Sequence, residues 1–406
     1  MQPLPPRLQV IFERTKLVCF SRFEIRIPET ATVVYGPAEV EAPISFFKGQ
    51  SKKIADHVAA RLVEIEEERE LLREDDIRNL PLFGKTIEGT VPGQKIVFGS
   101  KNQIGYAIHS YIPIGDDLFI QHLNSILPEY DRIAIFNRVA SHLLPRSEDE
   151  VSPGPGTCIE GGFVALDPQR ERVTIGIRLK EFPDVHISLD VHKNQKYLAE
   201  TGRLELMREQ AREAAEERGL GAVFARIKML RHEKRQLGDW KGVEILTRTP
   251  AHLHNTEAHE FRYESLGAVH DSLRPHLDIR LDSGVASNRN ASVQPSITDD
   301  EAIALWDQLL NSIRVRPLKN SSINPGNPVG RSEARWIDSG MPCPQTGWWL
   351  CKQEAIDGER RRYFTAGELM PKIILFGEPS LWERLTGASP RFSSTTAWKL
   401  DDQATE

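Results

Sequence analysis

The stretch SEDEVSPGPG, residues 147–156, decides how the rest of the chain divides. Its first half is charged and its second half is rich in proline and glycine, which is typical of a linker. On both sides the sequence predicts the same order of elements: strands, a long helix, more strands and a closing helix. We therefore expect an α+β fold with two related lobes of antiparallel sheet and packed helices, covering residues 10–146 and 157–317.

The first lobe combines two kinds of hydrophobic period. Alternating apolar residues predict strands over residues 16–27, 31–35, 40–47, 95–98 and 105–112. Residues 51–73 change to a helical period, in which Ile54, Val58, Leu62 and Ile65 form one apolar stripe. The many glutamates of this segment are interpreted as the solvated face of the helix. A second helix is expected over residues 130–144, ended by Pro145.

The second lobe repeats this order. Strands are expected over residues 162–166, 173–179, 185–192, 243–248, 260–265 and 276–281, with a helix over 204–217. The pattern Thr298-x-x-Glu301 is a capping box and predicts the start of the closing helix. The buried stripe of that helix should consist of Trp306, Leu309, Leu310 and Ile313.

The last part of the chain differs in composition. Residues 318–331 are rich in Asn, Pro, Ser and Gly and predict a second linker. Five of the seven tryptophans follow it, so we expect a small aromatic-rich module over residues 332–402. These tryptophans are expected to form its core, with packing on the preceding lobe or anchoring of a partner as the alternatives.

Charge and hydropathy exclude some classes of protein. With 52 Lys and Arg against 58 Asp and Glu, the net charge is −6, so no broad basic surface for nucleic acid is expected. No apolar stretch approaches the length of a membrane span. The first residues lack the pattern of a secretory signal, which taken literally predicts a cytoplasmic protein.

The four cysteines are too few for a disulfide scaffold. Buried thiols are one interpretation. If the protein is exported, the pairs to test for disulfides are Cys343 with Cys351 and Cys19 with Cys158.

Motifs for catalysis and for cofactors are missing from the sequence. It contains neither the Gly-x-Ser-x-Gly elbow of lipases nor the Gly-x-x-x-x-Gly-Lys-Ser/Thr loop that holds phosphates. His252, His254 and His259 are spaced as zinc ligands can be, but the segment lacks cysteine and is expected to be an exposed loop. We therefore expect no enzyme activity, no cofactor and no metal.

A basic segment near residue 230 is the candidate for partner binding. Arg231, Lys234 and Arg235 concentrate positive charge in an acidic protein, and Trp240 follows at a turn. Cations beside an exposed tryptophan are typical of contact hot spots. A solvated hairpin is the alternative interpretation.

Several of these segments resemble one family. Residues 15–28, TKLVCFSRFEIRIP, with 34–37, VYGP, are similar to the opening of the Tle-cognate immunity proteins of the fourth class of type VI lipase effectors. Residues 158–165, 183–189, 230–235 and 304–317 resemble the C-terminal domain of that family in order and spacing. The tail instead resembles an accessory module found beside secretion effectors.

The resemblance implies a protein that grips a cognate phospholipase effector with two lobes and blocks its active-site cleft or lid. It also implies a periplasmic location, because such lipases attack from the periplasm. Two alternatives stay open at this point: a hydrolase whose catalytic residues are dispersed along the chain, and an envelope scaffold that uses the aromatic tail as its contact.

Overall fold

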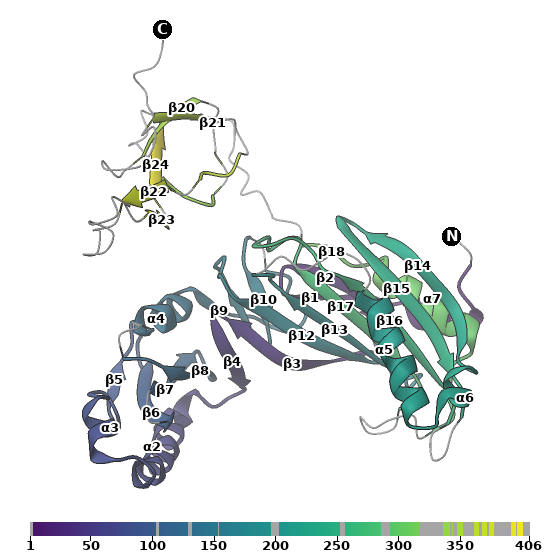
Figure 1. Cartoon of the computed structure of the whole chain (residues 1–406), viewed down its shortest axis with the longest axis horizontal. Coiled ribbons are helices and arrows are strands. Elements are labelled where there is room, and N and C mark those ends of the chain that lie inside the picture. The colour runs from purple at the N-terminus through teal and green to yellow at the C-terminus, as the bar shows by residue number, and fades with distance from the viewer. Residues whose placement is uncertain are drawn as a thin grey trace. The chain divides into compact units, whose positions relative to one another are not determined.

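The computed structural model contains two compact units, residues 1–321 and 322–406. In the first unit it describes residues 3–102, 105–128, 132–152, 154–195, 203–251, 256–285 and 293–316. In the second it describes residues 336–341, 343, 347–351, 361–364, 368–371, 373–376, 391–394 and 396–400. The first unit is the larger and carries the site discussed below (Figure 1).

One antiparallel sheet of twelve strands runs through the first unit. From edge to edge its strands are β14 (Lys228–Leu237), β15 (Trp240–Thr249), β16 (Ala258–Ser265), β17 (His276–Asp282), β13 (His186–His192), β12 (Glu171–Arg178), β3 (Thr32–Val40), β4 (Ala42–Phe47), β8 (Asp117–Ile126), β7 (Gly105–Ile114), β6 (Lys95–Asn102) and β5 (Thr86–Glu88). β3 and β12 join the two halves, with Val33 opposite Ile177. The predicted α+β class is confirmed.

The main core lies between the larger half of this sheet and a second layer. That layer contains the sheet β1 (Thr15–Phe20), β2 (Phe23–Pro28) and β18 (Arg314–Val315), with the helices α1 (Pro6–Phe12) and α7 (Asp299–Leu310). Phe20, Phe23 and Trp306 are fully buried there. The expected stripe of α7 is confirmed, because Trp306, Leu309, Leu310 and Ile313 are all buried.

The capping box of α7 is present as the sequence predicts. The Thr298 hydroxyl accepts a hydrogen bond from the Glu301 backbone N–H at 3.3 Å, and the Glu301 carboxylate accepts one from the Thr298 backbone N–H at 3.0 Å. The pair satisfies two backbone donors that a helix start leaves open.

A second core fills the other half of the sheet. Helix α2 (Ile54–Glu70), preceded by η1 (Ser51–Lys53), packs on β6 and β7, and α3 (Glu74–Arg78) and α4 (Ile133–His142) complete this half. Ile65 of α2 and Phe136 of α4 are fully buried in it. Glu64, Glu66, Glu67 and Glu70 of α2 are exposed, as expected of a solvated face. Glu68 departs from this expectation, because it is largely buried and pairs with the buried Arg61 at 2.8 Å.

The segment predicted as one strand over residues 16–27 is a hairpin. β1 and β2 pair from Thr15 with Pro28 to Phe20 with Phe23, and Ser21 and Arg22 form the turn. Ser21 has a φ of 47° without being a glycine, so the turn carries none of the usual sequence signals. Because no turn signal interrupts the alternation of apolar residues, the sequence predicted one strand where the structure has two.

The predicted linker over residues 147–156 lies between two strands of one small sheet. This sheet contains β9 (Leu143–Pro145), β11 (Gly162–Val164) and β10 (Thr157–Ile159). Cys158 of β10 forms a disulfide with Cys19 of β1. Both cysteines are fully buried. The disulfide thus fixes the hairpin of β1 and β2 to the strand that follows the predicted linker. The division into domains at residues 10–146 and 157–317 stays a prediction.

The second unit contains a sheet of β19 (Trp336–Asp338), β24 (Ala397–Leu400), β20 (Gly347–Cys351) and β21 (Arg361–Phe364), and a pair formed by β22 (Ile373–Phe376) and β23 (Arg391–Ser394). Trp349 and Trp398 are buried in its core with Cys343 and Cys351. These two tryptophans therefore pack inside the module. Across the described residues of both units, no helix has the length and hydropathy needed to span a membrane.

Candidate functional site

The polar sheet face is the surface of β12, β13, β16 and β17 that points away from the main core. In β13, Ile187, Leu189 and Val191 are buried in that core, and the residues between them are polar and partly exposed. Alternate residues of a strand point to opposite faces, so the neighbouring strands extend the same pattern. The face consists of Arg172, Thr174, Arg178, His186, Ser188, Asp190, His192, Glu260, Arg262, Glu264, His276, Asp278, Arg280 and Asp282.

The carboxylates in the middle of this face are paired with cations. Asp190 accepts from Arg172 at 2.6 Å, and Asp278 accepts from both Arg262 and Arg280 at 2.8 Å. Burial alone would raise the pKa of Asp278, but the hydrogen bonds from these two arginines lower it below its usual range. The carboxylates in this part of the face therefore all have arginine partners.

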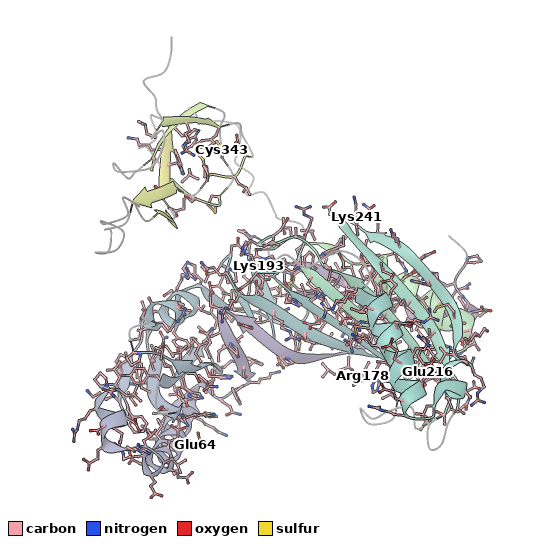
Figure 2. All side chains as sticks on the ribbon, in the orientation of Figure 1. Glu64, Arg178, Lys193, Glu216, Lys241 and Cys343 are labelled. Atoms are coloured by element: carbon pink, nitrogen blue, oxygen red, sulfur yellow. A yellow bond between two sulfur atoms is a disulfide. The ribbon has the colours of Figure 1, made fainter. Side chains whose placement is uncertain are left out.

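A pocket of about 720 Å³ opens between one end of the polar sheet face and the helices α5 (Arg203–Glu217) and α6 (Gly221–Phe224). Ala215 of α5, with Leu220, Val223 and Phe224, supplies an apolar wall. The sheet supplies a polar wall. Figure 2 labels Arg178, on β12, and Glu216, on α5, which belong to the elements of these two walls. The volume lies in the range of ordinary ligand pockets.

Glu260 and Asp282 stand side by side on the polar wall. The strand register places Arg178 opposite His186, His186 opposite Asp282, and Asp282 opposite Glu260, so the four residues form one row across four strands. No ion pair involves Glu260 or Asp282 among the described residues, in contrast to Asp190 and Asp278. The two carboxyls therefore lie together without an ion-pair partner among the described residues, although Arg178 lines the same pocket and Arg280 acts on Asp282.

Their surroundings favour the protonated forms. Burial raises the pKa of Asp282, and Arg280 offsets only part of this effect. Burial and the neighbouring Asp282 also raise the pKa of Glu260. Glu260 keeps an exposed surface at the pocket rim, so water should limit its shift, and we expect the effect to be stronger for Asp282.

Replacing both groups by their amides, Glu260→Gln with Asp282→Asn, should stabilise the protein more at pH 7 than at pH 4. A carboxyl with a raised pKa in the folded state contributes stability that is fully present below its ordinary pKa, which is 3.8 for Asp and 4.5 for Glu. This contribution is lost as the pH rises through the folded-state pKa. Urea unfolding of both proteins at the two pH values measures the difference. An equal difference in the free energy of unfolding at pH 4 and pH 7 would contradict the raised pKa values of Glu260 and Asp282.

The segment nominated for partner binding is an ordered edge strand, β14, and two of its cations are occupied. Arg231 lies 2.6 Å from Glu244 and 2.7 Å from Asp307, and Arg235 lies 3.0 Å and 2.6 Å from the same two carboxylates. Glu244 is fully buried and also accepts from the indole N–H of Trp306 at 2.9 Å. These arginines connect the edge of the sheet to α7.

Trp240 does not present an exposed anchor, because only 3% of its surface is accessible. Its indole N–H donates to the Pro275 carbonyl at 3.0 Å, and its ring lies 4.6 Å from that of Phe23. The expectation of an exposed tryptophan is therefore corrected: Trp240 faces the core from the first position of β15. Lys234 is exposed, and partner binding by Arg231, Lys234 and Arg235 stays a prediction.

The histidine segment does not gather a metal site within the described residues. His259 is buried and contacts the Ser283 hydroxyl at 2.8 Å and Asp299 of α7 at 3.0 Å. Burial lowers the pKa of His259, although Asp299 acts in the opposite direction. His252 and His254 lie outside the described residues. No group of three metal-binding side chains occurs in the described part of the chain.

Comparison with known proteins finds one family model that matches part of this chain. Residues 150–318 match the model of the Tle cognate immunity protein 4 C-terminal domain. The resemblance predicted from the sequence is thereby confirmed over this stretch. No curated protein matches the sequence.

Solved structures share the fold over most of the chain. The immunity protein TplEi of the type VI secretion system of Pseudomonas aeruginosa, complexed with an "L" peptide, is 21% identical, with a TM-score of 0.57. A chain of the Tle4–Tli4 complex is 19% identical, with a TM-score of 0.60. Each match covers 75% of this chain and 98% of the other.

Proposed function

We propose that this chain is a type VI secretion immunity protein that binds and inhibits a cognate phospholipase effector. The observation that carries the proposal is the match of residues 150–318 to the Tle cognate immunity protein 4 C-terminal domain. The shared fold supports it, because nearly the whole length of two immunity-protein chains matches this one. One of those structures is itself a Tle4–Tli4 complex.

Inhibition would consist of covering the active-site cleft of the effector or holding its lid. Such a role requires a wide contact surface. The exposed part of the polar sheet face, with its adjoining pocket, is the candidate, whereas α5 contacts the face at Arg262 and Glu264. Protection of the cell also requires slow dissociation and therefore tight binding. A nanomolar dissociation constant corresponds to a binding free energy of about −12 kcal/mol. In this proposal the hydrolytic chemistry belongs to the effector and the chain contributes binding alone.

The buried Cys19–Cys158 disulfide supports a location in an oxidising compartment. The periplasm is such a compartment in bacteria. We therefore assign the chain to the periplasm as part of the same proposal.

Titrating the purified chain into its cognate lipase effector should abolish phospholipid hydrolysis at one molecule per molecule of effector. The chain alone should release no fatty acid from the same vesicles. Fatty-acid release is the measurement, and size-exclusion chromatography of the mixture should show a single complex.

Two results would overturn the proposal. Steady hydrolysis by the chain alone would favour a hydrolase with dispersed catalytic residues. An effector that stays fully active in a large excess of folded chain would show that inhibition is not its role. An unrelated protein of similar size and charge is the control for non-specific effects on the vesicles.

A further inference from the structure

We infer that the pocket between α5, α6 and the polar sheet face receives a lysine or arginine side chain of the bound partner protein. This inference rests on the proposed function, and it adds the recognition chemistry of one place on the surface. Two features of the pocket carry it: its unequal walls and its charge.

The two walls suit an amphipathic side chain. Leu220, Val223 and Phe224 form an apolar wall opposite the carboxyls of Glu260 and Asp282. Lysine and arginine side chains have a hydrocarbon stem that packs on apolar groups and a charged end that forms ion pairs with carboxylates. A side chain of this kind would bury its stem against α6 while its head reaches the two acids.

The charge of the pocket also points to a cation. Neighbouring acids on the same face have arginine partners, whereas Glu260 and Asp282 form no ion pair with described residues. Arg178 also lines the pocket, two strands away from Asp282 in the same row, with His186 between them. An incoming cation would therefore meet two adjacent carboxyls. It would stabilise their charged forms, which burial disfavours and which their raised pKa values reflect.

A metal ion fits the pocket less well than a side chain. Hard cations such as calcium take six to eight oxygen ligands, and two carboxyls supply only part of such a set. The described residues contain no group of three His, Cys, Asp or Glu side chains placed to hold a metal. The apolar wall would also contribute nothing to its coordination.

Binding kinetics with the effector test the inference directly. The variant Glu260→Gln with Asp282→Asn should bind the effector at least tenfold more weakly, mainly through faster dissociation, because the partner cation would be left without its carboxylates. The matched control is Glu213→Gln with Glu217→Gln, which removes two exposed carboxylates from neighbouring α5. The control should stay within twofold of the wild type.

Circular dichroism should confirm that both variants are folded. Wild-type affinity in the pocket variant, or equal losses in both variants, would overturn the inference while leaving the proposed function intact. If the wild-type chain does not bind the effector, the proposed function fails, and the pocket is then tested by the following measurement.

The isolated full-length chain allows a test without the effector. Nα-acetyl-arginine amide, at millimolar concentration, should lower the pKa of Asp282 as followed by carboxyl carbon NMR. Nα-acetyl-citrulline amide, which has nearly the same shape without the charge, should not. An unchanged titration with the arginine probe, or the same change with both probes, would contradict a cation site.

Discussion

Reduction of the Cys19–Cys158 disulfide should lower the free energy of unfolding by about 3–5 kcal/mol. The bond closes a loop of 139 residues and restricts the unfolded chain, which lowers the conformational entropy of the unfolded state and so stabilises the folded state. Backbone hydrogen bonds between Ser21 and Cys158, at 3.0 and 2.7 Å, reinforce the same junction. The disulfide therefore joins the N-terminal hairpin to the strand that follows the linker.

Urea unfolding of the full chain with and without dithiothreitol measures this contribution. The midpoint should fall clearly when the reductant is present. The variant Cys19→Ala with Cys158→Ala is the control, since it should start from the lowered stability and show no further response to dithiothreitol. A wild-type midpoint that the reductant does not move would contradict a stabilising role.

Local elements of this fold follow from the sequence because their causes are local. The apolar stripe of α2 and the capping box of α7 each need residues within a turn or two of one another, and both segments are helical in the structure. The strands β13 and β17 alternate apolar and polar residues strictly, so their positions were predicted within one residue.

Pairings between distant segments could not be predicted in this way. The two halves of the unit meet where β3 pairs with β12, more than a hundred residues apart in the chain, and no local pattern encodes that register. β14 was interpreted as a basic patch because charged residues occupy most of its positions and conceal its alternation. β8 was not predicted at all.

The candidate site depends on the same non-local register. Glu260 and Asp282 are 22 positions apart, and only the pairing of β16 with β17 places them opposite one another. The sequence predicted both strands but contained no signal for which residues would face each other. The pocket is likewise completed by α6, a helix of four residues that is too short to leave a periodic pattern.

Replacing Trp240 by alanine should destabilise the protein by about 3–5 kcal/mol, because a large side chain would leave a well-packed core. Its ring contacts Phe23 of the N-terminal hairpin, and its indole N–H is bonded to the Pro275 carbonyl. Both contacts lie inside the protein. The sequence had suggested instead that Trp240 is exposed and contacts a partner.

The next residue provides a matched control for this prediction. Lys241 follows Trp240 in the same strand but points to the opposite side and is exposed, and Figure 2 labels it on the β14–β15 hairpin. Lys241→Ala should therefore change the free energy of unfolding by less than about 0.5 kcal/mol. Urea unfolding followed by far-ultraviolet circular dichroism compares the two variants with the wild type. A Trp240→Ala protein as stable as the Lys241→Ala protein would show that Trp240 contributes little to the stability of the core. Partner contact would then again be a candidate role for Trp240.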